Sequence, residues 1–259
     1  EKDLAKPRLI SRAEEGSGEE SARASLSDFY AADFENKEKD DKLEVIMEDE
    51  TTKNVESAYS NIVQDYEAKV KSHDLDHRYI EKFLSLFNPK QKVLDIGAGT
   101  GTISNEMQDN HRLDVTAIDL SREMVDLAKK NYPDLKIIQM DLRKLEFPDN
   151  TFDGAFANYS LIHVAEADIP STLNEIARVL KSGGYLYLAL QEPITQMDKD
   201  GYYPVVYKKE VKMFINLFTE SDMRGYLKNA GFMVVNINRR PPEKETEFPF
   251  NKLFVFAQK

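Results

Sequence analysis

The chain has 259 residues, 41% of them hydrophobic, and a formal net charge of −11, which fits one large domain with an additional polar segment. It contains no cysteine, so disulfides, thiolate metal sites and cysteine nucleophiles are excluded, and with only 4 His we expect no metal site. We find no apolar run of the about 18–20 residues that a membrane helix needs, no signal peptide and no basic excess for DNA, and therefore expect a cytoplasmic protein that binds neither membrane nor DNA.

Residues 1–42 are predicted to form an acidic, polar arm. Residues 1–55 hold 9 Lys and Arg against 16 Asp and Glu, and residues 14–21 carry no apolar side chain. Phe29, Tyr30 and Phe34 nevertheless need a surface on which to pack. The arm is therefore expected to lie on its own domain or on a neighbouring copy, as in a homodimer, and the alternative is a lid or regulatory segment.

A domain is predicted to follow over residues 43–259, and its residues 43–88 are predicted to be helical. Apolar residues recur there every three or four positions and would share one helix face: Val55, Tyr59, Ile62, Val63, Tyr66 and Val70. We expect the two tyrosines to pack in the core. A second helix is predicted from Asp76 to Phe87, and Asn88-Pro89 ends it.

Short apolar strands then alternate with amphipathic helices. Strands are predicted at 92–96, 113–119, 135–141, 152–158 and 185–190, and helices at 102–108, 122–131 and 169–180, the last stopped by Ser182-Gly183-Gly184. A helix at 221–229 precedes strands at 233–238 and 252–257, which are joined without a helix and are therefore antiparallel. The pattern predicts an α/β fold with a mostly parallel sheet and helices on both faces.

The strongest motif runs from Val93 to Gly101, where a strand breaks into glycines before a helix. Such a loop lets backbone N–H groups approach a ligand. Thr102 stands where the dinucleotide fingerprint has glycine or alanine, and no Gly-Lys-Ser/Thr follows, so neither that fingerprint nor a P-loop is present. Asp95, two residues before Gly97, would repel a pyrophosphate and attract an ammonium group.

Two further acids follow neighbouring strands. Asp119 ends the second predicted strand, 20 residues after Gly99, a spacing at which an acid accepts both hydroxyls of a ribose. Asp141 ends the third, where it could accept from an adenine amino group. All of these positions lie at the carboxyl ends of strands, where open α/β sheets bind ligands.

These residues, with the segments 152–159 and 180–184, resemble the class I S-adenosylmethionine-dependent methyltransferases, of the small-molecule type. The resemblance covers roughly residues 58–259. It implies a Rossmann-like seven-stranded sheet of order 3-2-1-4-5-7-6, with the last strand antiparallel, and S-adenosylmethionine as cofactor. The residues that it implies at the cofactor are Asp95, Gly97, Ala98, Gly99 and Gly101 at the methionine portion, Asp119 and Leu120 at the ribose, Asp141 and Leu142 at the adenine, and Asn158 and Tyr159 near the sulfonium.

The reaction so implied is in-line methyl transfer to a small organic acceptor, by O- or N-methylation. Because the cofactor is already activated, the protein mainly aligns two reactants and excludes water. His163 and Glu192, near the ends of the fourth and fifth strands, are the candidate general bases. The alternative is that His163 is a buried or surface histidine without a catalytic role and that Glu192 is an acid exposed to solvent.

The acceptor is predicted to bind under an aromatic-rich segment at 194–218, which could form a lid or simply pack on the sheet edge. Three alternatives to small-molecule methyl transfer remain open: an aminopropyl transferase of the same fold, a module that binds the cofactor without turnover, and a methyltransferase acting on a protein or tRNA. The acidic charge argues against tRNA.

Overall fold

The computed structural model describes residues 50–63, 65–67, 75–195, 200–206, 210–243 and 247–259. All of these belong to one unit, Ile46–Lys259. The arm predicted over residues 1–42, its packing surface and its dimer contact therefore lie outside the described residues, as does Val70.

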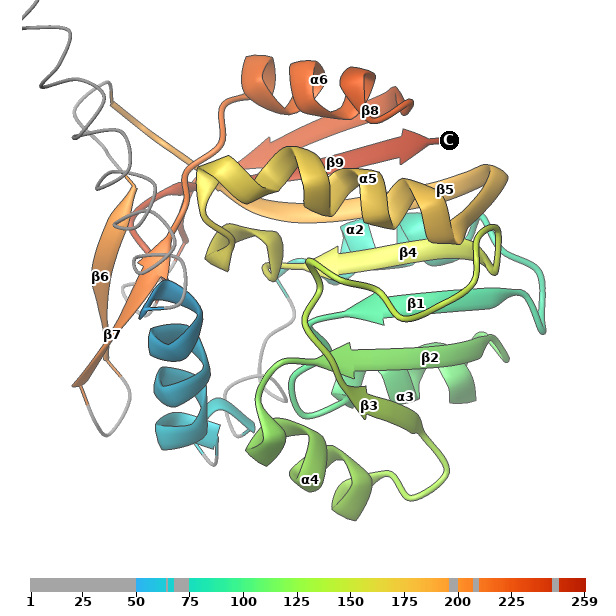
Figure 1. Cartoon of the computed structure of the whole chain (residues 1–259), viewed down its shortest axis with the longest axis horizontal. Helices are drawn as coiled ribbons and strands as arrows, with labels where there is room; N and C mark the ends of the chain where they lie inside the picture. The colour runs from blue at the N-terminus through green and yellow to red at the C-terminus, as the bar shows by residue number, and fades with distance from the viewer. Residues whose placement is uncertain (1–49, 64, 68–74, 196–199, 207–209, 244–246) are drawn as a thin grey trace, which may run out of the picture. The chain divides into compact units, whose positions relative to one another are not determined.

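A seven-stranded sheet of order β3-β2-β1-β4-β5-β9-β8 forms the centre of this unit (Figure 1). Strands β1 to β5 are parallel to one another, and β9 is antiparallel to both β5 and β8. Counted without the separate β6–β7 pair, this is the order 3-2-1-4-5-7-6, and the predicted fold is confirmed. The strands are β1 (Lys92–Ile96), β2 (Asp114–Asp119), β3 (Lys136–Gln139), β4 (Phe152–Asn158), β5 (Leu180–Glu192), β8 (Met233–Arg240) and β9 (Asn251–Gln258).

Helices pack on both faces of the sheet because successive strand side chains point to opposite sides. In β1, Val93 belongs to one hydrophobic cluster with residues of α2 (His77–Leu84), α3 (Thr102–Asp109) and α4 (Arg122–Asn131). Leu94 belongs to the other, with residues of α5 (Ile169–Val179), α6 (Glu220–Asn229) and the helical segment at 50–63. Each fully buried aliphatic or aromatic side chain in these clusters contributes about 1.5–3 kcal/mol.

The glycines after α5 do not stop the helix as predicted. The helix ends at Val179, and β5 begins at Leu180, so Ser182-Gly183-Gly184 lie within the strand. Gly183 has φ of +78° and donates its N–H to the carbonyl of Lys259, while the β4–β5 register shifts beside it. These glycines form an irregularity at the start of β5, and the positive φ of Gly183 favours glycine at that position.

The aromatic-rich segment at 194–218 contains a hairpin of β6 (Gly201–Val206) and β7 (Glu210–Ile215), which the sequence reasoning left without strands. Just after β7, the backbone N–H of Asn216 donates to Ile162 at 2.7 Å. Its side-chain amide donates to Val164 at 3.1 Å. The hairpin is therefore held against the 3-10 turn η1 (Leu161–His163) and the residue that follows it, before the second turn η2 (Glu166–Asp168) and beyond the carboxyl ends of the parallel strands (Figure 1). Among the described residues, every helix is too short or too polar to cross a bilayer.

Candidate functional site

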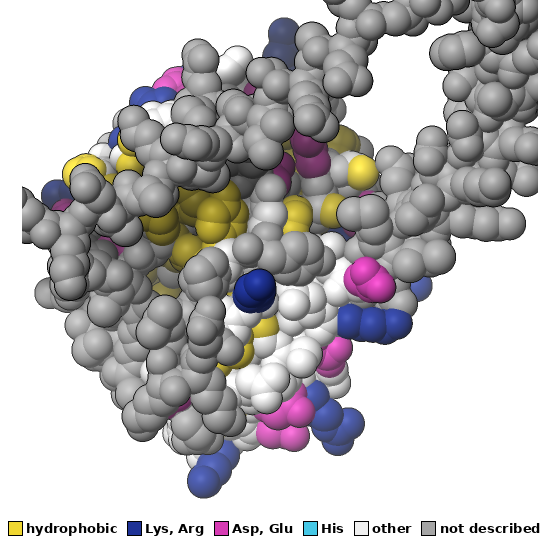
Figure 2. Space-filling view, turned by 90° about the vertical axis from the view of Figure 1, so that its left-hand side faces the viewer, with side chains coloured by type: hydrophobic (Ala, Val, Ile, Leu, Met, Phe, Trp, Pro, Cys, Tyr) yellow, Lys and Arg dark blue, Asp and Glu magenta, His cyan; other side chains and the backbone are white. Residues whose placement is uncertain are grey.

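A cavity of about 330 Å³ lies at the carboxyl ends of the parallel strands. Helical residues at 50–63 and 65–67, the carboxyl ends of the parallel strands with the loops after β1 to β4, and the β8–β9 connection contribute to its lining. Figure 2 looks at this end of the molecule and shows hydrophobic side chains gathered in a hollow. The volume falls in the range of small-molecule and cofactor sites.

The glycine loop forms one wall of the cavity. Gly97, Gly99 and Gly101 have φ of +75°, +56° and +77°. A Cβ on Gly97 would lie 2.4 Å from the Cβ of Ser160, and one on Gly99 would lie 3.1 Å from the ring of Tyr66. The sequence thus places glycine where the backbone conformation and close neighbours exclude larger residues.

Asp119 lies in the cavity wall at the end of β2. One carboxylate oxygen accepts from the N–H of Gly99 at 2.8 Å and the other from the N–H of Ser121 at 2.9 Å. Burial raises the pKa of Asp119 to about 6, although these hydrogen bonds act in the opposite direction. Because a carboxylate has about four acceptor positions, acceptor capacity remains for a ribose hydroxyl.

Asp95 lies under the loop, in a smaller hollow of about 20 Å³ that also contains Ala98. Its carboxylate is buried and accepts from the hydroxyl of Ser104. Burial raises its pKa to about 7, against the effect of Ser104, and the charge of Asp119 adds to the rise. Gly97 and Asn158 line both this hollow and the main cavity, so the two acids face one connected region.

Asp141 and Leu142 also line the cavity, but they lie in the loop after β3, because the strand β3 is shorter than predicted and ends at Gln139. The carboxylate of Asp141 forms an ion pair with Arg143 at 2.7 Å, and Arg143 also contacts Asp168 at 3.0 Å. Asp141 is therefore positioned beside the cavity with part of its acceptor capacity already used. Leu120 and Arg143 complete this side.

Asn158 and Tyr159 lie at the end of β4 in the cavity lining. The side-chain oxygen of Asn158 is buried and has no hydrogen-bond partner among the described residues. Tyr159 adopts a positive φ of 58°, and its hydroxyl donates to Asp76 at 2.8 Å. The unpaired amide oxygen marks a place where a bound ligand can donate a hydrogen bond.

His163 lines the cavity, and both of its ring nitrogens are engaged. Nδ1 lies 2.8 Å from the carbonyl of Phe214 and must carry the proton, because a carbonyl only accepts. Nε2 therefore accepts from the hydroxyl of Tyr59, also at 2.8 Å. Burial lowers the pKa of His163 to about 4, so its ring is neutral at physiological pH.

The structure does not bring Glu192 into the cavity lining. Its carboxylate is buried against Arg239 of β8, with Nε to carboxylate distances of 2.9 and 2.8 Å. The preceding residue, Gln191, lines the cavity instead. Its side-chain oxygen is buried without a hydrogen-bond partner in the described part of the chain. Side chains alternate along a strand, so a one-residue error reverses the direction of the predicted group.

Sequence reasoning missed two groups of lining residues. Thr51, Thr52 and Glu56 lie on the helical segment, where Tyr59 and Tyr66 pack against the core as expected and line the cavity as well. The β8–β9 connection supplies Glu247, Phe248 and Pro249, and the start of β9 supplies Lys252. The three- and four-residue spacing on the helix was a usable signal for the first group. The second group had no local signal.

Comparisons with known proteins agree with this geometry. A family model described as a methyltransferase domain matches residues 93–184. A demethylmenaquinone methyltransferase of Symbiobacterium thermophilum is 31% identical over 177 residues, 63% of this chain and 69% of the relative. One of Renibacterium salmoninarum is 42% identical over 101 residues, 39% of this chain and 41% of the relative. The chain thus spans between about two fifths and two thirds of these curated relatives.

The chain belongs to the class I S-adenosylmethionine-dependent methyltransferases. A solved structure, the 1,6-didemethyltoxoflavin-N1-methyltransferase of Burkholderia thailandensis, shares the fold, with a TM-score of 0.62 at 23% identity over 82% of this chain and 90% of that one. S-adenosylmethionine is the cofactor of this family. The residues present fit it: the loop at Gly97 and Gly99 has no room for side chains, and Asp119 has free acceptor positions beside the unpaired oxygen of Asn158.

Proposed function

We propose that this chain transfers the methyl group of S-adenosylmethionine to a small organic acceptor with an apolar body and an O–H or N–H group. One observation carries the proposal: a single cavity has the glycine loop and Asp119 on one side and an apolar, partly unpaired surface on the other. Two reactants can therefore meet in one enclosed space.

On the cofactor side, the residues of this chain would bind and orient S-adenosylmethionine. Asp119 would accept the ribose hydroxyls, and the loop from Gly97 to Gly101, with Asp95 beneath it, would hold the methionine portion. Asp141 and Leu142 would lie against the adenine. The cofactor supplies an already activated methyl group, so alignment and exclusion of water are what the protein contributes.

On the acceptor side, Val55, Ile162 and Phe248 offer apolar contact. Gln191 adds an unpaired acceptor oxygen, and leaving such an atom buried and unsatisfied costs about 1–3 kcal/mol. An acceptor that donates an O–H or N–H to Gln191 removes this cost. The curated relatives named for demethylmenaquinone support a ring-containing, largely apolar acceptor.

The proposed role of His163 is positioning. A pKa of about 4 makes the ring a poor store for a proton at neutral pH, and its Nε2 already holds the hydroxyl of Tyr59. We propose that His163 fixes Tyr59 at the cavity wall, and that alignment of the reactants supplies most of the rate enhancement.

The test combines cofactor binding with turnover. S-adenosylhomocysteine should bind by calorimetry with micromolar affinity, about −8 kcal/mol, and Asp119→Asn should weaken it more than tenfold, about 1.4 kcal/mol. Asp126→Asn, an exposed acid on α4, serves as the matched control and should bind normally. Radiolabelled S-adenosylmethionine should then release methyl to phenols, hydroquinones or aromatic amines. Binding without release to any of these would support the non-catalytic alternative, and unchanged affinity in Asp119→Asn would overturn the assigned cofactor site.

A further inference from the structure

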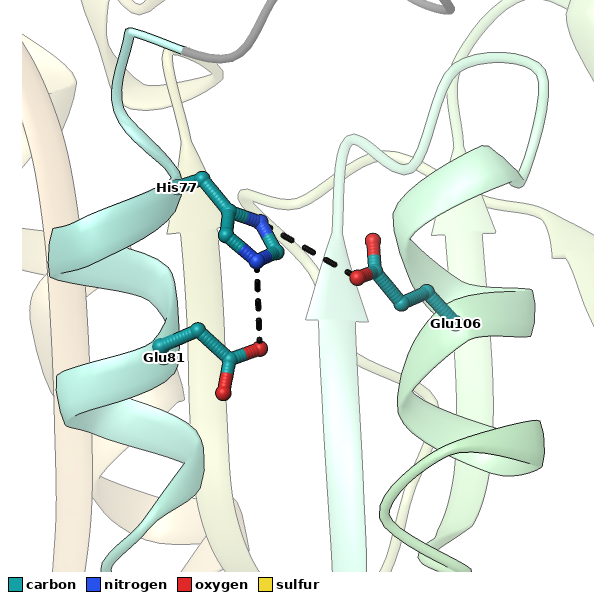
Figure 3. Close-up of side chains that lie close together, drawn as sticks. All are labelled: His77, Glu81 and Glu106. Carbon is teal, nitrogen blue, oxygen red and sulfur yellow. Dashed lines mark ion pairs between the residues drawn. The ribbon is translucent and has the colours of Figure 1, made fainter.

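A second cluster of ligand-type side chains lies between α2 and α3. His77 and Glu81 occupy positions i and i+4 of α2, and Glu106 faces them from α3 (Figure 3). His77 Nε2 lies 3.6 Å from Glu81 Oε1, and His77 Nδ1 lies 3.9 Å from Glu106 Oε1. One ligand atom from each residue can be chosen so that all three lie within 4.8 Å of one another.

A second imidazole joins this cluster from the loop after α3. His111 Nε2 lies 3.2 Å from Glu81 Oε1. Two of the chain's 4 His thus converge on Glu81, and His77 also contacts Glu106. None of the four side chains belongs to the described lining of the cavity, so the cluster is separate from the cofactor site.

The charge of the cluster is the reason to look for a cation. Among the described residues, Glu81 and Glu106 form ion pairs with these imidazoles and with no Lys or Arg. In the described part of the chain, these two carboxylates therefore lack the permanent positive charge of a Lys or Arg beside them. A divalent cation bound by all of these groups would supply it.

We propose that His77, Glu81 and Glu106, with His111 beside them, form a zinc-type divalent metal site. Imidazole nitrogen and carboxylate oxygen are both zinc ligands. Tetrahedral zinc with bonds of about 2.0–2.2 Å places its ligand atoms about 3.3–3.6 Å apart. The separations of 3.2 and 3.6 Å around Glu81 agree with this, and the half-exposed Glu106 needs only a side-chain rotation to approach.

The position of the site indicates what a bound metal would do. Helix α3 begins at Thr102, directly after Gly101 of the cofactor loop. A metal that joins α2 to α3 would fix this helix, and with it the end of the loop, without lining the cavity. The proposed role of the metal is therefore structural. The number of histidines in the sequence could not by itself reveal this site.

The test uses the full chain without a polyhistidine tag, stripped of metal by a chelator and titrated with ZnCl₂ in a calorimeter. We expect saturable binding of one zinc ion and a rise in the melting temperature. His77→Gln and Glu106→Gln should each weaken binding at least tenfold and remove the rise. Both residues are at the surface, so these variants should fold.

Asp109→Asn is the matched control, because Asp109 is an exposed acid on the same helix that contacts only Asn105 among the described residues. It should bind zinc as the unchanged protein does. Equal zinc binding in the control and in both cluster variants would overturn the proposal. The absence of saturable zinc binding by the unchanged protein would overturn it as well.

Discussion

The chemistry available to His163 depends on its neighbours more than on its residue type. A histidine near a strand end suggests a general base, and that was the prediction. In the structure, Phe214 and Tyr59 occupy both ring nitrogens, and burial lowers the pKa to about 4. These contacts connect the hairpin at β7, the turn η1 and the helical segment at one point of the cavity wall.

The rate should therefore not depend on protonation of His163 near neutrality. We expect any change in the rate of methyl release between pH 5.5 and 8 to have the same midpoint in His163→Gln, because the His163 ring stays neutral above a pKa of about 4 while Asp119 and Asp95, with pKa values of about 6 and 7, ionise in this range. Tyr59→Phe should lower turnover and leave affinity for S-adenosylhomocysteine unchanged. An acidic limb with a midpoint near the ordinary imidazole pKa of about 6.5, absent in His163→Gln, would show that His163 is the base after all.

The raised pKa of Asp95 leads to a second prediction, which concerns how the stability of the protein depends on pH. Its folded-state pKa of about 7 is above its ordinary value, so the folded protein binds the proton more tightly than the unfolded chain does. The free energy of unfolding should fall as pH rises from about 4 to 7. His163 acts in the opposite sense between about 4 and 6.5, because its folded-state pKa is lowered.

The comparison with Asp95→Asn separates these two effects. Asparagine can still accept from Ser104 but cannot ionise, so the variant should gain stability relative to the unchanged protein as pH rises. Urea unfolding at several pH values measures the difference. A difference that stays constant between pH 4.5 and 7.5 would mean that Asp95 ionises at its ordinary pKa in the folded protein.

At the scale of elements, one buried arginine holds the acceptor-side wall. Arg240, at the end of β8, forms ion pairs at 2.7 Å with Asp76, just before α2, and with Glu247 of the cavity lining. Burial alone would raise the pKa of Glu247, but the two-point contact with Arg240 outweighs it and holds the pKa at about 2. Tyr159 joins the same network through Asp76.

Removing this arginine should be costly. Arg240→Ala leaves two largely buried carboxylates without their partner, and breaking a buried ion pair typically costs about 3–5 kcal/mol. We expect a loss of this size in urea unfolding, together with weaker binding of acceptor by the protein that still folds. Arg122→Ala, an exposed arginine on α4, is the control and should change stability little. A similar small effect for Arg240→Ala would show that solvent enters and replaces the network.

The elements differ in how well local sequence defines them. The bounds of α4 and β4 agree with the prediction, because a serine cap at Ser121 and a short apolar run determine them locally. The β6–β7 hairpin was missed because its pattern of aromatic, basic and proline residues does not alternate clearly. The Arg240–Asp76 pair joins residues 164 positions apart, a distance at which no local pattern carries information.

At the scale of the whole molecule, the sheet topology decides where the site lies. Parallel strands bring their carboxyl ends to one edge, so the glycine loop, Asp119 and Asn158 converge although they are far apart in the chain. This part of the site followed from strand order and could be predicted. The acceptor side could not, because it is built from the helical segment, the η1 turn and the β8–β9 connection, whose mutual placement depends on tertiary contacts.

The last prediction concerns residues 1–42. In the part of the chain that the structure describes, the two hydrophobic clusters consist of residues between Ala58 and Ala257. Because this core is assembled from the domain itself, deleting residues 1–42 should leave the melting temperature and the affinity for S-adenosylhomocysteine unchanged. Calorimetry and size-exclusion chromatography check this. A lower melting temperature would show that the arm packs on the domain, and a change from dimer to monomer would show that it joins two copies.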